Sequence, residues 1–169
     1  MKHLNKIYLL GVSGSGKTHL GKILSKKLKI PLYDSDEVMF IKKFTKSRPK
    51  EKRKQLIDKI SKKEKWIIDS RGSDWSREPM KKADIIIWLQ PNRFIRVFRI
   101  LKRYLSRKGE NEESLKSVIN VLKYSWGYKK NIKNTSSYLE IIKFIEKNNL
   151  KPIIIRNNNQ KKRLLRDFK

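Results

Sequence analysis

Residues 11–18 decide the fold, and they read Gly11-Val12-Ser13-Gly14-Ser15-Gly16-Lys17-Thr18. The stretch matches the pattern G-x-x-x-x-G-K-[ST] at every fixed position. An apolar run at residues 7–10 leads into it, and a helical pattern at residues 17–28 follows it. A strand, a glycine-rich turn and a helix in this order place backbone N–H groups around a polyphosphate at the helix N-terminus. The alternative is a glycine-rich turn that carries a lysine by accident.

Each position of this loop has an expected chemical role. Glycines permit backbone geometry and a close approach that a Cβ would block, the lysine neutralises β- and γ-phosphate charge, and the threonine hydroxyl is placed to bind Mg²⁺. The sequence therefore predicts a site for a Mg²⁺–nucleoside triphosphate, with ATP and Mg²⁺ as cofactors. The predicted phosphate-binding residues are Gly11, Ser13, Gly14, Ser15, Gly16, Lys17 and Thr18.

Length and composition exclude several other classes of protein. A chain of 169 residues with 37% hydrophobic residues suits one globular domain, which we expect to cover residues 1–169. No apolar run approaches the roughly 20 residues of a membrane span, so we expect no membrane partner. The absence of cysteine excludes disulfides and thiolate zinc sites, and only two histidines leave almost nothing for a multi-histidine metal site. We expect a reducing compartment, the cytoplasm.

The net charge of +28 allows two interpretations. Such an excess attracts phosphates, nucleic acid or anionic surfaces, and nonspecific binding of nucleic acid would follow. The excess is mostly lysine and comes with abundant isoleucine and asparagine, a combination that an AT-rich genome also produces. The charge alone therefore assigns no partner.

Short apolar runs alternate with longer helical patterns along the chain, which is typical of a parallel α/β sheet. Strands are predicted at residues 6–11, 31–34, 65–69, 84–89 and 152–155. Helices are predicted at residues 17–28, 49–64, 93–107, from about 112 to 126, from about 137, and at 159–169. In the helix after residue 112, Leu115, Val118, Ile119, Leu122 and Trp126 form the expected buried stripe. Ser137 and Glu140 form a capping-box pattern.

Two carboxylates follow the second predicted strand, in the sequence Tyr33-Asp34-Ser35-Asp36. They would lie at the carboxyl edge of the sheet, where phosphate and acceptor meet. The alternative is a pair of helix-capping aspartates. No guanine-reading N-K-x-D motif follows the loop, which argues against a GTPase. The third predicted strand ends in Asp69 followed by Ser70 and not in the Asp-Glu of motor ATPases, which leaves a small-molecule kinase as the favoured class.

From Lys6 to Phe40, which includes the phosphate loop and the two aspartates, the chain resembles the shikimate kinase and nucleoside monophosphate kinase group of P-loop kinases. Further on it resembles the adenylate-kinase-related DNA topology modulation proteins. The residues that carry this second resemblance are Phe44 to Pro49, Trp66 to Asp69, Ala83 to Leu89 with Pro91, and the arginine-rich helix that follows. The resemblance implies a three-layer P-loop fold, with helices flanking a five-stranded parallel sheet in the order 2-3-1-4-5. It also implies that Asp34 and Asp69 help to hold Mg²⁺ and that Asp36 contacts the acceptor.

The chain departs from the nucleotide kinase pattern after the third strand. It reads Asp69-Ser70-Arg71-Gly72, where nucleotide kinases usually have Asp-Gly-x-Pro-Arg. The aspartate is kept and the proline is missing, which leaves recognition of a nucleoside monophosphate open. Arg71 either replaces the shifted arginine as an acceptor-binding residue or is a loop arginine in solvent.

Arginines recur along the predicted helix at residues 93–107, on the face opposite its apolar stripe. Aligned guanidinium groups repel one another unless anionic oxygens lie between them, and they suit a phosphoryl group in transfer. We expect Arg99, Arg103 and Arg107 to be catalytic, in a short lid region at residues 99–114, with Arg96 on the same face. The alternative is a solvated basic face.

The sequence thus predicts a phosphotransferase in which Lys17, Asp36 and the lid arginines move the γ-phosphoryl group of ATP to a small, nucleotide-like acceptor. Two rivals stay open: an ATP-dependent, nucleic-acid-associated (DNA topology modulation) protein without small-molecule kinase activity, and a kinase-like protein that binds ATP without transfer. His19 is expected to be structural, Trp66, Trp88 and Trp126 are expected in the core, and Trp75 either packs or stacks on an acceptor ring.

Overall fold

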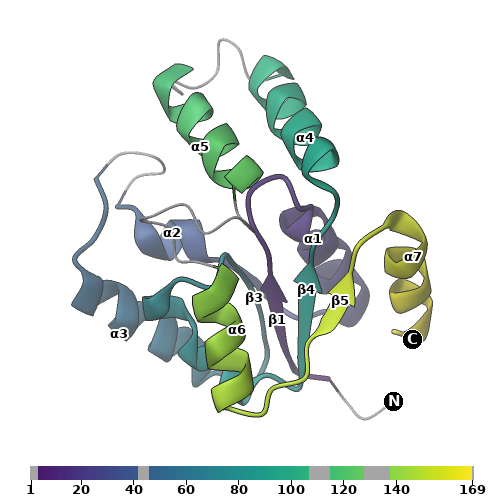
Figure 1. Ribbon diagram of the computed structural model, residues 1–169. Helices are drawn as coiled ribbons and strands as arrows, with labels where there is room; N and C mark the ends of the chain where they lie inside the picture. Colours follow the sequence, from purple (N-terminus) through teal and green to yellow (C-terminus); the bar gives the residue numbers. More distant parts are fainter. Residues whose placement is uncertain (1–3, 42–45, 107–114, 128–137, 169) are drawn as a thin grey trace.

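The computed structural model describes residues 4–41, 46–106, 115–127 and 138–168. Strands in this part of the chain are β1 (Lys6–Leu10), β2 (Leu32–Asp34), β3 (Trp66–Ser70), β4 (Ile85–Leu89) and β5 (Ile153–Ile155). They form one sheet in the order β2-β3-β1-β4-β5, and every neighbouring pair is parallel (Figure 1). This confirms the α/β class and the strand order that the family resemblance implied, and each predicted strand is correct to within one residue at either end.

The helices fill the connections between the strands. They are α1 (Lys17–Leu28), α2 (Ser35–Met39), α3 (Lys50–Ser61), α4 (Arg93–Ser106), α5 (Leu115–Gly127), α6 (Tyr138–Lys147) and α7 (Asn158–Asp167), with short 3-10 turns η1 (Asp74–Ser76) and η2 (Glu78–Lys82). The predicted helix at residues 17–28 is confirmed, and α2, η1 and η2 were not predicted. Ser137, the first residue of the predicted capping box, lies outside the described residues. In the described ranges no helix has the length and apolar content needed to cross a lipid bilayer.

Alternate residues of the central strand face two separate cores. Tyr8 and Leu10 pack into a core that α3 and α6 cover, whereas Ile7 and Leu9 pack into a core that α1 and α7 cover. Strands buried on both faces need apolar residues at successive positions, which is why residues 7–10 of β1, 66–68 of β3 and 85–89 of β4 read as continuous apolar runs. Trp66 and Trp88 lie in the first core as predicted, and Trp75 packs there at 5% exposure, so the packing alternative for Trp75 is confirmed.

Helices α4 and α5 lie side by side beyond the carboxyl ends of the strands (Figure 1). The arginine face of α4 is the inward one, since Arg96 is only 4% exposed while Phe94, Phe98 and Leu105 are more than 60% exposed. The predicted buried stripe of α5 is partly wrong. Val118 is buried, but Ile119 and Trp126 are exposed, so the assignment of Trp126 to the core is also wrong.

Trp126 instead packs against its neighbouring helix. Its ring makes an edge contact with Phe94 at 5.4 Å between centroids, and the Arg93 guanidinium lies 4.7 Å from the Trp126 centroid. An aromatic ring gains from contacts of this kind even where solvent reaches it. This explains how an exposed tryptophan can contribute to the joining of α4 and α5.

Candidate active site

The loop between β1 and α1 has the backbone shape that an anion site requires. Gly14 and Gly16 have φ values of 77° and 96°, in the left-handed region that glycine adopts at little cost. At Gly14 an added Cβ would lie 2.5 Å from the carbonyl oxygen of Arg96, so this position has room only for glycine. The Ser15 N–H donates to the Val12 carbonyl at 3.1 Å and closes the turn.

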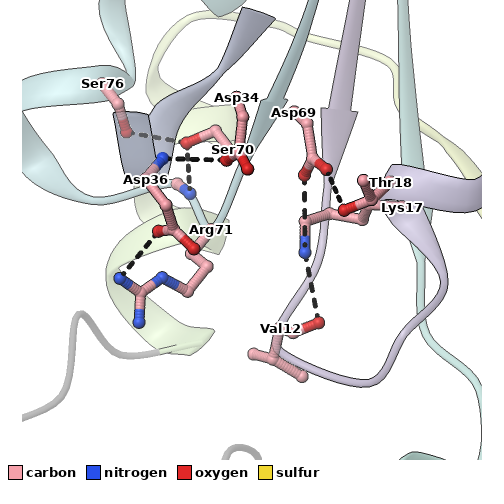
Figure 2. A network of polar contacts seen from close by, with 10 residues as sticks. Val12, Lys17, Thr18, Asp34, Asp36, Asp69, Ser70, Arg71 and Ser76 are labelled. Atoms are coloured by element: carbon pink, nitrogen blue, oxygen red, sulfur yellow. Dashed lines mark hydrogen bonds and ion pairs between the residues drawn. The ribbon is translucent and has the colours of Figure 1, made fainter. Parts of the chain in front are cut away.

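Lys17 and Thr18 meet Asp69 at the end of β3 (Figure 2). The Thr18 hydroxyl donates to Asp69 Oδ2 at 2.6 Å, and Lys17 Nζ lies 3.6 Å from Asp69 Oδ1 and 3.3 Å from the Val12 carbonyl oxygen. Lys17 and Asp69 are both buried, at 8% and 3% exposure. A buried ammonium beside a buried carboxylate and a hydroxyl provides one group for phosphate oxygens and two oxygen ligands for a hard cation.

Strand register brings a second carboxylate to the same edge of the sheet. Asp34 pairs with Asp69 across β2 and β3, so the two predicted Mg²⁺-binding carboxylates follow neighbouring strands. The Asp34 side chain also accepts the Asp36 N–H at 2.9 Å and caps α2. Asp34 is therefore a helix cap, as the alternative interpretation predicted, and it also lines the cavity described below.

Asp36 has a different environment, because its carboxylate faces Arg71. Arg71 Nη2 lies 3.2 Å from Asp36 Oδ1, and both side chains are about one-third exposed. Arg71 is therefore held by an ion pair and is not a loop arginine free in solvent. A pair of this kind, open to a cavity, offers a hydrogen-bond acceptor and a forked cation to a small polar molecule.

A buried hydroxyl cluster supports the turn that carries Arg71. The hydroxyls of Ser70 and Ser76 lie 2.9 Å apart, Ser70 Oγ accepts the Gly72 N–H at 3.1 Å, and the Tyr8 hydroxyl donates to the Ser76 carbonyl at 2.9 Å. Burial is the main cause that raises the pKa of Tyr8 to about 12. Tyr8 is therefore a neutral donor at physiological pH, and the turn has fixed hydrogen-bond partners.

The arginines of α4 differ in their contacts. Arg96 is buried and hydrogen-bonded to Pro91 and Ser125, whereas Arg99 Nη1 donates to the carbonyls of Gly14 and Ser15 at 3.4 and 3.0 Å. Both contacts contradict a solvated basic face for this part of the helix. Arg103 lines the cavity, and its buried Nε has no hydrogen-bond partner among the described residues. Arg107 and residues 107–114 of the predicted lid lie outside those residues.

Two cavities meet over the loop. One, of about 250 Å³, is lined by the loop, by Lys17 and by the predicted residues Asp34, Asp36, Asp69, Arg71 and Arg103. The other, of about 620 Å³, extends between Leu89, Ile95 and the start of α7 at Asn158. Gly16, His19 and Arg99 line both. Together they form one track with a charged end and a less charged end, a shape that suits a triphosphate and its nucleoside.

The sequence did not predict the contacts of three residues at or beside the loop. His19, predicted to be structural, is exposed and lines both cavities, and its place one position after Thr18 in the first turn of α1 was the signal for this. Arg96 was predicted on the arginine face but not as a buried contact. Ser125 had no signal, because a lone serine in a helix indicates nothing about its partners.

In the described residues no three carboxylates or histidines come together as a metal cage. A Mg²⁺ ion that arrives with a triphosphate needs only one or two protein oxygens, because phosphates and water supply the others. Thr18 and Asp69, with Asp34 beside them, therefore fit such an ion.

Comparison with known proteins agrees with this geometry. A family model described as an AAA domain matches residues 7–118. The uncharacterized protein YqaC of Bacillus subtilis is 34% identical over 104 residues, which cover 61% of this chain and 58% of that relative, so the match spans less than two thirds of YqaC. A shikimate kinase of Thermodesulfovibrio yellowstonii is 29% identical over 134 residues, covering 69% of this chain and 77% of that enzyme.

The same fold occurs in a solved structure, a shikimate kinase from Acinetobacter baumannii in complex with shikimate. The TM-score is 0.56 at 19% identity, and the alignment covers 97% of this chain and 90% of that one. At this identity the similarity establishes a shared fold, that of P-loop kinases.

Proposed function

The chain belongs to the AAA domain family of P-loop proteins, and from this membership and its site we propose that it transfers the γ-phosphoryl group of ATP to a small acceptor. One observation carries the proposal. The cavity that contains Lys17, Thr18 and Asp69 also contains the Asp36–Arg71 pair, so a phosphate-binding end and a polar acceptor end open into the same space.

At the phosphate-binding end, the loop amides and Lys17 hold the triphosphate. Thr18 and Asp69, with Asp34 beside them, hold Mg²⁺, which when bound neutralises phosphate charge and orients the transferring group. The Thr18–Asp69 bond of 2.6 Å keeps both oxygens at one place, so the ion meets a pair that is already assembled. The charge of Lys17 is buried, which makes its attraction for phosphate stronger than in water.

At the acceptor end, Asp36 accepts a hydrogen bond from the acceptor hydroxyl and Arg71 binds an anionic group of the same molecule. The acceptor oxygen bonds to the γ-phosphorus as the β–γ bridging bond breaks, ADP leaves, and the acceptor proton passes to Asp36. Because the two side chains are paired at 3.2 Å and partly exposed, the hydroxyl of the acceptor can reach Asp36 while its anionic group reaches Arg71. Hydroxy acids and phosphate esters both have this combination of groups.

Arginines from α4 complete the proposal. Arg103, whose Nε is buried without a partner among the described residues, stabilises the transferring phosphoryl group. Arg99, which donates to the Ser15 carbonyl and lines the same cavity, assists Arg103 in stabilising this group. The sequence assigns the same role to Arg107, and this part of the proposal rests on the sequence alone.

The test is ADP production from Mg²⁺–ATP with a panel of acceptors: nucleoside monophosphates, nucleosides, shikimate, gluconate and duplex DNA. Lys17→Ala is the variant without the phosphate-binding ammonium, and Lys22→Ala, an exposed lysine of the same helix, is its matched control. We expect one small acceptor to accelerate ADP release in the wild type and in Lys22→Ala, but not in Lys17→Ala. Stimulation by DNA alone, or by no compound, would replace the proposal with a nucleic-acid switch or an ATP-binding protein without transfer.

A further inference from the structure

The outer side of the phosphate loop is covered by the α4–α5 hairpin, meaning helices Arg93–Ser106 and Leu115–Gly127. Three consecutive loop carbonyls accept hydrogen bonds from it. The Ser125 hydroxyl donates to Ser13 O at 3.3 Å, and Arg99 Nη1 donates to Gly14 O at 3.4 Å and to Ser15 O at 3.0 Å. A loop whose N–H groups face a phosphate turns its carbonyls away, and an unpaired buried carbonyl is costly. The hairpin supplies donors for these carbonyls.

Arg96 fixes the donor that α5 contributes. Its guanidinium is buried, with Nε 3.2 Å from Ser125 Oγ, Nη2 2.5 Å from Ser125 O and Nη1 3.2 Å from Pro91 O. Because Arg96 donates to Ser125 Oγ, that hydroxyl has its own hydrogen left for Ser13 O. Ser125 is fully buried, so water does not compete for this bond.

The backbone of Arg96 also touches the loop. Its carbonyl oxygen would lie 2.5 Å from a Cβ on Gly14, so α4 and the loop are packed backbone to backbone. Contacts of this kind have little freedom to adjust, because no side-chain rotamer can relieve a displacement. A shift of the hairpin therefore moves the loop, and a shift of the loop moves the hairpin.

We propose that Ser125 and Arg96 are positioning residues for nucleotide binding, which hold the phosphate loop in its anion-binding shape and couple it to the α4–α5 hairpin. The inference rests on the proposed function only in taking the loop as the site of a nucleotide's phosphates. Coupling between two sites is reciprocal. Nucleotide at the loop therefore stabilises α5, and loss of the α5 contact weakens nucleotide binding.

The first test is the affinity for MgADP, measured by titration calorimetry with no acceptor present. Ser125→Ala removes the hydroxyl, and one hydrogen bond of this kind corresponds to roughly two- to tenfold weaker binding. Ser61→Ala is the matched control. Ser61 is also a buried helical serine with two hydrogen-bond partners, the Asp58 carbonyl and Lys82, and it lies in α3. We expect Ser125→Ala to bind MgADP several-fold more weakly and Ser61→Ala to bind as the wild type does.

The second test is hydrogen exchange, which separates positioning from a general loss of stability. In the wild type, MgADP should slow amide exchange both in the loop and in α5. In Ser125→Ala the loop should exchange faster without nucleotide, and the slowing of α5 by MgADP should be reduced.

Arg96→Lys is the second variant, because an ammonium cannot reproduce the fork with which the guanidinium reaches Ser125 and Pro91 at once. We expect it to weaken MgADP binding several-fold as well. If one variant fails to fold, the other decides. Wild-type affinity in a folded variant, or equal losses in Ser125→Ala and Ser61→Ala, would overturn the inference and leave the kinase proposal untouched. If the binding and exchange results are as expected but no acceptor is phosphorylated, the inference stands and the kinase proposal is overturned.

Discussion

Gly14→Ala should disable the phosphate loop by a mechanism that can be separated from ordinary backbone strain. An alanine at φ 77° costs about 1–2 kcal/mol, because its Cβ approaches the following carbonyl. The new Cβ would also lie 2.5 Å from the oxygen and 3.0 Å from the carbon of the Arg96 carbonyl. Both atoms belong to backbone, so the loop and α4 must separate by at least about 0.5 Å. The loop amides then no longer reach their phosphate oxygens, and the loss of one or two such bonds, each about 1 kcal/mol, weakens MgADP binding roughly five- to thirtyfold.

Gly72→Ala is the matched control, because Gly72 has the same φ of 77° but different neighbours. Its Cβ would meet Leu10 Cδ1 at 2.7 Å and Ile141 Cδ1 at 3.1 Å, which are side-chain ends that can move. Both variants should lower Tm by roughly 2–8 °C from the shared strain. Only Gly14→Ala should lose the further rise in Tm that MgADP gives the wild type. An equal rise in both variants would refute the backbone-contact reasoning.

Three more predictions concern single side chains. Lys17→Ala should lower turnover at least about a hundredfold with an unchanged circular dichroism spectrum, and unaltered ATP consumption would remove Lys17 from the mechanism. Arg103→Ala should lower kcat far more than it raises KM for ATP, because Arg103 is assigned to the transferring group, and equal changes would instead indicate ground-state binding. Burial raises the pKa of Tyr8 from 10 to about 12, so the unfolded chain loses this proton first. Wild-type stability in urea should therefore fall by about 2 kcal/mol more than that of Tyr8→Phe between pH 10 and pH 12, and parallel curves would contradict the assignment.

Much of the fold could be predicted because its strands are buried on both faces. Residues 7–10 and 85–89 read as uninterrupted apolar runs, and the loop motif fixed where the first strand ends and α1 begins. The resemblance to P-loop kinases implied the strand order that sets β2 beside β3, so the carboxylates at the sheet edge could be predicted together, and the observed register places Asp34 opposite Asp69. These features depend on residues close in sequence and on the regular alternation of strands and helices, so they can be recognised from the sequence.

The orientation of the α4–α5 hairpin could not be predicted in the same way. A period of 3.6 residues separates two faces of a helix but does not say which one faces inward. The usual rule, apolar side in, fails for α4, because the helix turns Arg99 toward the loop carbonyls and Arg96 toward Pro91 and Ser125. Phe94 and Trp126 are then left on the outer side, where they contact each other. Which face of α4 turns inward therefore depends on where the loop lies in the folded protein, and the helix sequence alone does not specify it.

The charges of the site also bear on the meaning of the net charge of +28. Among the described residues that line the smaller cavity, the four cations Lys17, Arg71, Arg99 and Arg103 face the three carboxylates Asp34, Asp36 and Asp69. The cavity is therefore close to electrically balanced, and its cations are held by specific partners such as Asp36 and the loop carbonyls. A site selected for general attraction of polyanions would concentrate positive charge there, because local potential depends on the nearest charges. The larger cavity differs, because its lining in the described part of the chain includes Arg99, Arg156 and Lys161 but no carboxylate. In the smaller cavity the net charge is close to zero, so recognition of the transferring phosphoryl group and a small acceptor there has to come from the placement of a few side chains.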